Sequence, residues 1–215
     1  MKIAFKLAFY EYIMEATKKS LAKISKSLES SLEGRESMIK NTRQIVILCS
    51  ESIIDCHRGD PKSATKKIQS AKKLLAQYRK IAHGDLYKYL LMPEQEFVEA
   101  VTLFSILQNK PMPSVESLKV RDESYVLGLL DCIGELRRNV YDKIRVGKAK
   151  DAKKIFDIME ELYLQLYPFA YYDKVIKEAR KKLDVARILV EETRTALTEE
   201  IRRSELIDAF KDSKK

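Results

Sequence analysis

Apolar residues recur every three or four positions along most of the chain, and no stretch alternates steadily between apolar and polar residues. The first spacing is typical of amphipathic helices, whereas strict alternation would indicate strands. Sparse turn signals, such as HRGDP at 57–61 and NKPMPS at 109–114, separate the helical stretches. The pattern predicts an all-α fold, a single helical bundle of about seven helices. We expect them at residues 2–31, 36–57, 62–82, 94–108, 122–146, 149–166 and 172–203.

The helix predicted at 94–108 combines an apolar surface with two carboxylates. Glu96 and Glu99 lie about 60° apart on its surface, because an α-helix turns about 100° per residue. Most other positions are apolar, so we expect this helix to be buried on most of its faces. Acidic residues just after Pro93 would also stabilise the positive end of the helix dipole. The pair therefore has either a structural role at a helix N-terminus or a chemical role.

A second acidic pair lies in the segment 124–144, where Asp131 and Glu135 are one helical turn apart. They lie opposite an apolar stripe. That stripe comprises Val126, Leu129, Ile133, Leu136 and Val140. The structural alternative is a polar face in water, with Glu135 paired to Arg138 or Asn139.

Two glycines interrupt the same predicted helix. Gly128 and Gly134 each cost about 1 kcal/mol relative to alanine in a helix interior. Such a cost suggests that another group approaches the helix backbone closely at these positions.

Two carboxylates from each of two helices would form an all-oxygen ligand set if folding brought them together. On an exposed helix, like charges one turn apart cost only a few tenths of a kcal/mol, whereas unpaired carboxylates in a dry site cost several kcal/mol each. Such a group protonates, pairs with Arg or Lys, or binds a cation. Oxygen ligands suit Mg²⁺ or Mn²⁺, and water activated by the cation would then serve as nucleophile without a catalytic histidine.

The charge balance suggests the kind of partner. The chain of 215 residues carries a formal net charge of +9 and has a pI of about 9.3. A basic balance favours an acidic partner, either nucleic acid or an anionic membrane surface, although a Lys-rich soluble protein has the same composition. The three cysteines form no CxxC motif, so neither a disulfide framework nor a zinc site is supported. A reducing, cytoplasmic location fits this usage.

No linker rich in Gly, Ser or Pro divides the chain, so we expect one domain spanning residues 1–215. Within it we expect an N-terminal amphipathic helix at 1–34, a core at 35–203 and a tail at 204–215. Charged residues interrupt the first apolar stretch, which excludes a membrane span there. We expect this helix to pack in the core or between subunits, and we predict no membrane partner.

Four stretches of the sequence resemble one known family. QEFVEA at 95–100 and YVLGLLDCIGELRRNVYDKIRVGK at 125–148 are similar to the two acidic motifs of the translin family. KNTRQIVILCSESIIDCHR at 40–58 and YYDKVIKEARKKLDVARILVEETR at 171–194 are similar to its early helix and its last long helix. The chain most nearly resembles translin-associated factor X, the catalytic branch, as a microbial single-chain member.

The resemblance implies a function as well as a fold. It implies a closed, barrel-like homo-oligomer, such as an octamer, that binds RNA or single-stranded DNA inside and cleaves RNA with Mg²⁺ (or Mn²⁺). Glu96, Glu99 and Asp131 would be the catalytic and metal-binding residues of this endoribonuclease, with Glu135 beside them. One alternative is a non-catalytic scaffold of the translin type that binds single-stranded DNA or RNA. Another is a helical interaction protein that binds no nucleic acid.

The resemblance also places a basic RNA-contacting stretch around Lys40 and Arg43. Arg137 and Arg138, which follow the second acidic motif, are further candidates for RNA binding. An ordinary salt bridge explains each arginine equally well. If these residues bind RNA, we expect them to contact phosphates rather than bases, because charge dominates affinity for nucleic acid.

Overall fold

Every regular element between residues 2 and 213 is helical, and these are the residues that the computed structural model describes, with side chains from residue 12 onward. The all-α prediction is therefore confirmed. The elements are α1 (Lys2–Arg58), α2 (Pro61–Arg79), the 3-10 helix η1 (Gly84–Tyr89), α3 (Leu91–Leu107), α4 (Val115–Leu118), α5 (Asp122–Arg145), α6 (Ala149–Leu166), the 3-10 helix η2 (Tyr167–Tyr172) and α7 (Ala179–Asp212).

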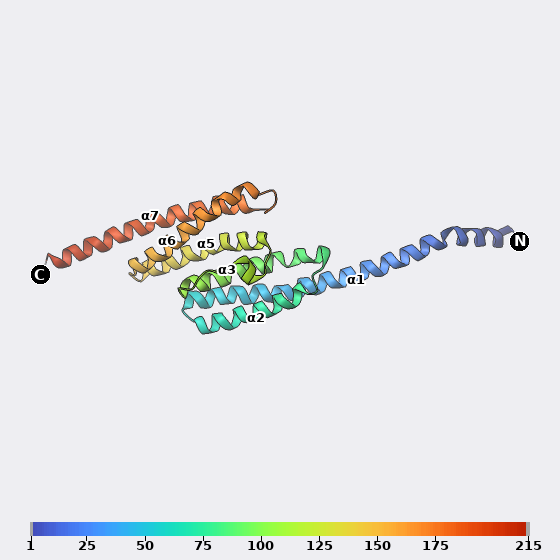
Figure 1. The fold of residues 1–215 in the computed structure, drawn as a ribbon, viewed down its shortest axis with the longest axis horizontal. Coiled ribbons are helices and arrows are strands. Elements are labelled where there is room, and N and C mark those ends of the chain that lie inside the picture. The colour runs from blue at the N-terminus through green and yellow to red at the C-terminus, as the bar shows by residue number, and fades with distance from the viewer. Residues whose placement is uncertain (1, 214–215) are drawn as a thin grey trace.

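The helices pack side by side, and α3 and α5 lie at the centre (Figure 1). α5 contacts α3, α6 and α7, while α1 packs against α2 and α3. Because α3 has neighbours on most sides, its apolar residues Phe97, Val98, Ala100 and Leu103 are almost fully buried. The predicted burial of this helix is confirmed. The two acidic motifs therefore lie on adjacent helices in the middle of the bundle.

α1 is one continuous helix, so the break predicted between residues 31 and 36 is wrong. The prediction took Gly34 as a turn signal, but η1 crosses α1 at this point. A Cβ atom at Gly34 would lie 3.3 Å from Cδ1 of Leu86, and Arg35 Nε donates a hydrogen bond to the Tyr89 hydroxyl at 2.9 Å. Gly34 therefore marks a close approach between helices rather than a turn.

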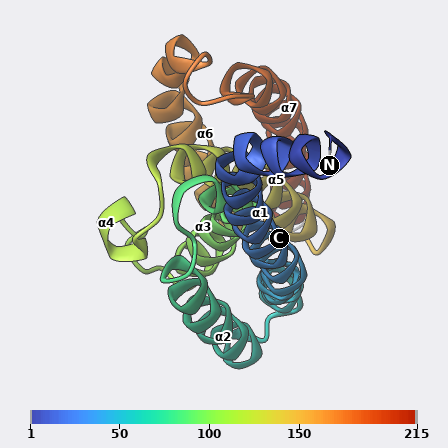
Figure 2. The same ribbon diagram turned by 90° about the vertical axis from the view of Figure 1, so that its right-hand side faces the viewer.

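Both long helices project beyond the bundle, α1 at one end and α7 at the other (Figure 1). Figure 2 shows the bundle end on, with the N-terminal part of α1 toward the viewer. The described side chains at 12–33 are all exposed, so core packing of the N-terminal helix is wrong for these residues. Packing between subunits stays a prediction. Across residues 2–213, none of the helices has an apolar stretch that would carry it through a bilayer.

The last helix begins at Ala179 rather than at residue 172, and it continues to Asp212 rather than ending at 203. The intervening chain forms η2 and a turn. In that turn Glu178 has a positive φ of 73°, and the Asp173 carboxylate accepts a hydrogen bond from the Arg180 backbone N–H at 3.1 Å. This local geometry ends the helical path before α7 begins.

The contact between α3 and α5 depends on Gly128. A Cβ atom at this position would lie 2.5 Å from the Gln95 backbone oxygen and 2.7 Å from Cβ of Val98. The close approach inferred from this glycine is therefore confirmed. At Gly134 an added Cβ would meet nothing within 4 Å, so the same inference is wrong there.

We expect Gly128→Ala to destabilise the protein by about 1–3 kcal/mol, because the added methyl group forces two packed helices apart. Gly134→Ala is the matched control on the same helix. It should raise stability by up to about 1 kcal/mol, since alanine costs less than glycine in a helix with free space around it. Urea unfolding monitored by circular dichroism measures both effects. Equal shifts of the two midpoints in the same direction would contradict this account of the contact.

Candidate functional site

The acidic residues of α3 and α5 come together at the contact between these helices. Gln95 Nε2 donates a hydrogen bond to Asp131 Oδ2 at 2.5 Å, which fixes the two motifs to each other. Burial and then the charge of Asp131 raise the pKa of both Glu96 and Glu99, and Glu135 contributes to the raised pKa of Glu99. All four predicted carboxylates therefore share one electrostatic environment.

Glu99 is the most perturbed of the four. Burial raises the pKa of its carboxyl group from the ordinary value of 4.5 to about 8, and the negative charges of Asp131, Glu96 and Glu135 add to that increase. The Lys182 ammonium group acts in the opposite direction. Among the described residues, the Glu99 carboxyl group has no hydrogen bond or ion pair. It therefore carries a proton at neutral pH when no further cation is present.

Two side chains from other helices bind the α5 carboxylates. Lys182 Nζ, on α7, forms an ion pair with Asp131 Oδ1. His57 Nε2, near the end of α1, donates a hydrogen bond to Glu135 Oε2 at 2.5 Å, and this bond lowers the pKa of Glu135. Arg138 Nη1 lies 3.8 Å from the same oxygen, so the predicted pairing of Glu135 with Arg138 is confirmed.

The sequence did not identify Lys182, His57 or Gln95 as part of the site. Lys182 belongs to a basic amphipathic stretch, KVIKEARKKLDVAR at 174–187, whose pattern is typical of a solvated helix face, and the chain has only two histidines. The usable signal for Gln95 was its position one residue before Glu96. In a helix this places the side chain about 100° away from Glu96, toward α5.

One wall of the site is apolar and the other is open. Cys49 on α1 and Cys132 on α5 are fully buried, and burial raises the pKa of both thiols, with a further contribution from the charge of Glu99. On the open side, Glu96 lines a surface hollow of about 560 Å³ and Asp131 lines another of about 310 Å³. A ligand therefore reaches the carboxylates from one side only.

Lysines surround the open side. Lys88 and Lys177 line the hollow that contains Glu96, and Lys181 joins Lys182 in the hollow that contains Asp131. A group of carboxylates bordered by lysines attracts a cation to its centre and an anion to its edge. A phosphodiester with a divalent cation has this distribution of charge.

The donor types in the site fit a hard divalent cation, but their present positions do not form a finished cage. Within residues 2–213, no three side chains of His, Cys, Asp or Glu stand together as metal ligands. Asp131 and Glu135 are held by Lys182 and His57, while the Glu99 carboxyl group has no partner in the part of the chain that the structure describes. Side-chain rearrangement, above all release of Asp131 from Lys182, is therefore required before a cation can bind.

The four basic residues predicted to bind RNA have different surroundings. Lys40 and Arg43 are exposed on α1, and no ion pair involving them occurs among the described residues. Arg137 Nη2 lies 3.0 Å from Glu192 Oε2. Arg138 pairs with Glu135 at the edge of the carboxylate group. Salt bridges therefore engage both α5 arginines, and the α1 residues keep free charges.

We expect Glu99→Gln to stabilise the protein at high pH in the presence of EDTA. The raised pKa of Glu99 means that the folded state holds a proton between pH 4.5 and about 8 that the unfolded state has released. Stability of the wild type therefore falls as pH rises through this window. Glutamine removes that loss, which we put on the order of 2 kcal/mol after allowing for partial solvent screening.

Thermal unfolding from pH 5 to pH 9 measures this difference. The wild type and Glu99→Gln should have similar stability at pH 5, separate progressively as the pH rises toward 8, and keep a constant difference above that. Glu199→Gln, an exposed change on α7, is the control and should follow the wild type throughout. A constant offset between Glu99→Gln and the wild type at every pH would contradict the proposed titration.

Comparisons with known proteins identify relatives of the chain and of its fold. Residues 33–197 match the Translin family. An uncharacterized protein of Methanocaldococcus jannaschii, MJ0175, is 35% identical over 162 residues, which cover 74% of this chain and 72% of the relative. A solved structure described as an AfC3PO–duplex RNA complex is similar at a TM-score of 0.78 and 29% identity, covering 86% of this chain and 97% of that one.

A crystal structure of AfC3PO is also similar, with a TM-score of 0.78 and 30% identity over 86% of this chain and 98% of that one. The fold extends to apo-NeC3PO, with a TM-score of 0.75 at 24% identity over 84% of this chain and 96% of that one. The family match covers both acidic motifs and all the helices that hold them. The chain belongs to the Translin family.

Proposed function

We propose that this protein binds RNA and hydrolyses its phosphodiester bonds with a divalent cation, Mg²⁺ or Mn²⁺. Glu96, Glu99 and Asp131 would hold the cation, and Glu135 would assist or orient. The observation that carries the proposal is the pKa of Glu99, raised to about 8 by burial and by the three other carboxylates. Such a concentration of negative charge is unfavourable without a cation, and catalytic sites are where large pKa shifts cluster.

Different residues of the site would have different roles in the proposed reaction. When bound, the cation supplies a positive charge for the phosphate oxygens and activates water as the nucleophile. Lys181 and Lys182 border Asp131 and are placed to bind the phosphate groups on either side of the scissile bond. Lys182 would move from Asp131 to a phosphate as the cation enters, so that both charges remain paired. Gln95 keeps Asp131 oriented through its hydrogen bond.

Binding of RNA is supported by the similar AfC3PO structure, whose description includes duplex RNA. The exposed Lys40 and Arg43 on α1 would contribute further phosphate contacts. Arg43 precedes Cys49 by six residues, or about 9 Å along the helix axis, so these contacts would lie near the carboxylates.

We further propose a closed homo-oligomer, such as an octamer, which the exposed apolar residues of the projecting helices support. These include Leu21, Ile24, Leu28, Leu206 and Phe210.

A non-catalytic RNA-binding scaffold is the second candidate. The pairing of Asp131 with Lys182 and the hydrogen bond between Glu135 and His57 favour it, because these contacts give two of the four carboxylates a partner without a metal. The two proposals differ in what the protein does to a bound RNA.

Incubation of the full chain with end-labelled RNA in Mg²⁺, Mn²⁺ or EDTA tests the proposal. We expect internal cleavage with a divalent cation and intact RNA in EDTA. The cation should also raise the melting temperature of the wild type above pH 7, and less so that of Glu99→Gln, because ligand binding to the folded state stabilises it. Light scattering should give a mass several times the 24.9 kDa of one chain, as the proposed homo-oligomer requires.

Other results of the same experiment would support one of the two alternative functions. RNA that is bound but never cut with either cation would support the scaffold. Failure to bind RNA even at low salt would indicate a helical interaction protein, since phosphate contacts are strongest there.

A further inference from the structure

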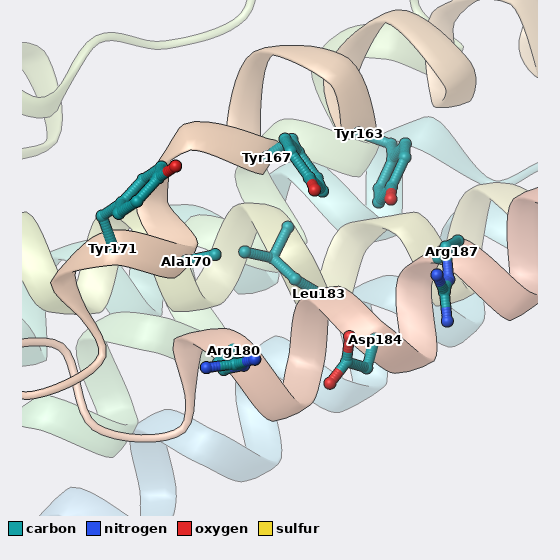
Figure 3. A pocket seen from close by; sticks show the side chains of 8 residues that line it. All are labelled: Tyr163, Tyr167, Ala170, Tyr171, Arg180, Leu183, Asp184 and Arg187. Atoms are coloured by element: carbon teal, nitrogen blue, oxygen red, sulfur yellow. The ribbon is translucent and has the colours of Figure 1, made fainter.

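A second hollow, separate from the carboxylates, combines aromatic rings with arginines. It has a volume of about 290 Å³ and lies between the end of α6, η2 and the first turns of α7. Tyr163, Tyr167 and Tyr171 stand on one side of it, and Arg180 and Arg187 stand on α7 at the other (Figure 3). We propose that this Tyr–Arg pocket binds an unpaired nucleotide of an RNA strand, with the base on a tyrosine ring and the phosphate on an arginine.

The tyrosines are available for stacking. Tyr171 is 90% exposed and Tyr167 is 58% exposed, an unusual state for large rings that border a hollow. Tyr163 and Tyr167 meet edge to face, with ring centroids 6.2 Å apart, so the contact covers at most one face of one of the two rings. A nucleobase stacks on such a ring whatever its sequence, because every base has a π-face.

The arginines supply the charge that a nucleotide needs. Among the described residues, the guanidinium groups of Arg180 and Arg187 have no hydrogen bond or ion pair. Asp184 lies between them on the same helix face and disfavours a bare anion (Figure 3). A ribonucleotide suits this mixture, since it offers a phosphate to the arginines and a 2′-hydroxyl or base amine to Asp184. A purely apolar peptide would leave both guanidinium groups unused.

The pocket connects with the carboxylate site along α7. Arg180 and Asp184 also line a neighbouring hollow, which shares Glu178 and Lys181 with the hollow that contains Asp131. Arg187 follows Lys182 by five residues, or about 7.5 Å along the helix axis. The three hollows form a connected path along α7 from the pocket to Asp131. An RNA strand at the carboxylates would therefore reach it.

This inference rests on the RNA binding in the proposed function and not on cleavage, so we test it in EDTA. The probes are labelled single-stranded oligoadenylate, an abasic ribose-phosphate strand of equal length, a blunt RNA duplex, and free AMP as competitor. We expect the wild type to bind oligoadenylate about tenfold more tightly than the abasic strand, as one stacked base provides. Tyr171→Ala should remove that preference and leave duplex binding unchanged.

Matched variants separate stacking from charge. Tyr171→Phe should retain the preference for bases. Tyr172→Ala should also retain it, because this neighbouring tyrosine is exposed as well but lines a different groove. Arg187→Gln should weaken binding of both strands alike and reduce the salt slope by about one, which is the signature of a lost phosphate contact. Arg202→Gln, an exposed change farther along α7, should weaken both strands less.

Three results would overturn the inference. Equal affinity of the wild type for oligoadenylate and the abasic strand would exclude base stacking, whether or not the protein cleaves RNA with Mg²⁺. A base preference that survives Tyr171→Ala would place the stacking elsewhere. Displacement of oligoadenylate by AMP at equal nucleotide concentration would assign the pocket to a free mononucleotide. Loss of cleavage alone would overturn the nuclease proposal and leave this pocket intact.

Discussion

Asp131→Asn is expected to reduce metal-dependent RNA cleavage by at least about 100-fold, which is the scale of losing one key charge-stabilising group in an active site. Asparagine keeps the shape of the side chain and can still accept the hydrogen bond from Gln95. It removes the negative charge that would help to hold the cation and that pairs with Lys182. RNA affinity should stay the same or rise slightly, because the protein gains one unit of positive charge.

The control for this prediction is another aspartate on the same helix that lies outside the carboxylate group. Asp142 on α5 is partly exposed and pairs with Arg145 at 3.1 Å, at the solvent side of the bundle. Asp142→Asn changes the net charge equally and should leave cleavage intact. Cleavage rates and RNA affinities are measured separately, the latter in EDTA. Cleavage by Asp131→Asn at the wild-type rate would remove Asp131 from the proposed chemistry.

The sequence predicted the α3 and α5 part of the site well because helix periodicity determines which residues share a face. The spacing of Glu96 with Glu99, and of Asp131 with Glu135, needs only the geometry of one helix. Bringing the two pairs together required the family resemblance, and Gly128 gave an independent signal of close packing. The contacts of His57 with Glu135 and of Lys182 with Asp131 were not predicted, because periodicity within one helix does not say which distant helix packs against it.

The limits of the helices were less predictable than their existence. Gly34 looked like a stop, yet a glycine in a helix has two physical explanations, a turn or a close neighbour, and the sequence around it does not distinguish them. At the other end of the chain, residues 172–178 have helix-compatible spacing. The positive φ of Glu178 and the hydrogen bond that Asp173 accepts from the Arg180 backbone N–H are features of the local backbone conformation, which apolar spacing alone does not predict.

Glu94, two residues before the first catalytic candidate, shows how a carboxylate with a structural role differs from those of the site. Its side chain is fully buried and accepts hydrogen bonds from Arg79 Nε at 2.9 Å, the Tyr87 hydroxyl at 2.8 Å and the Arg121 backbone N–H at 3.1 Å. Every donor comes from a different element, so this carboxylate joins α2, η1 and the start of α5 to α3. Unlike Glu99, it is fully satisfied.

Loss of the buried ion pair between Arg79 and Glu94 should therefore lower the free energy of unfolding without affecting the proposed RNA cleavage. We expect Arg79→Met and Glu94→Met each to lower the free energy of unfolding by about 3–5 kcal/mol, because each leaves an uncompensated buried charge. That loss is a large part of the 5–15 kcal/mol typical of a domain. The double variant should recover part of it, because two methionines replace the ion pair with apolar packing, while the Tyr87 hydroxyl and the Arg121 N–H still lose their acceptor. Urea unfolding of all four proteins gives the coupling energy directly. Additive losses in the double variant would mean that Glu94 acts through Tyr87 and Arg121 rather than through Arg79.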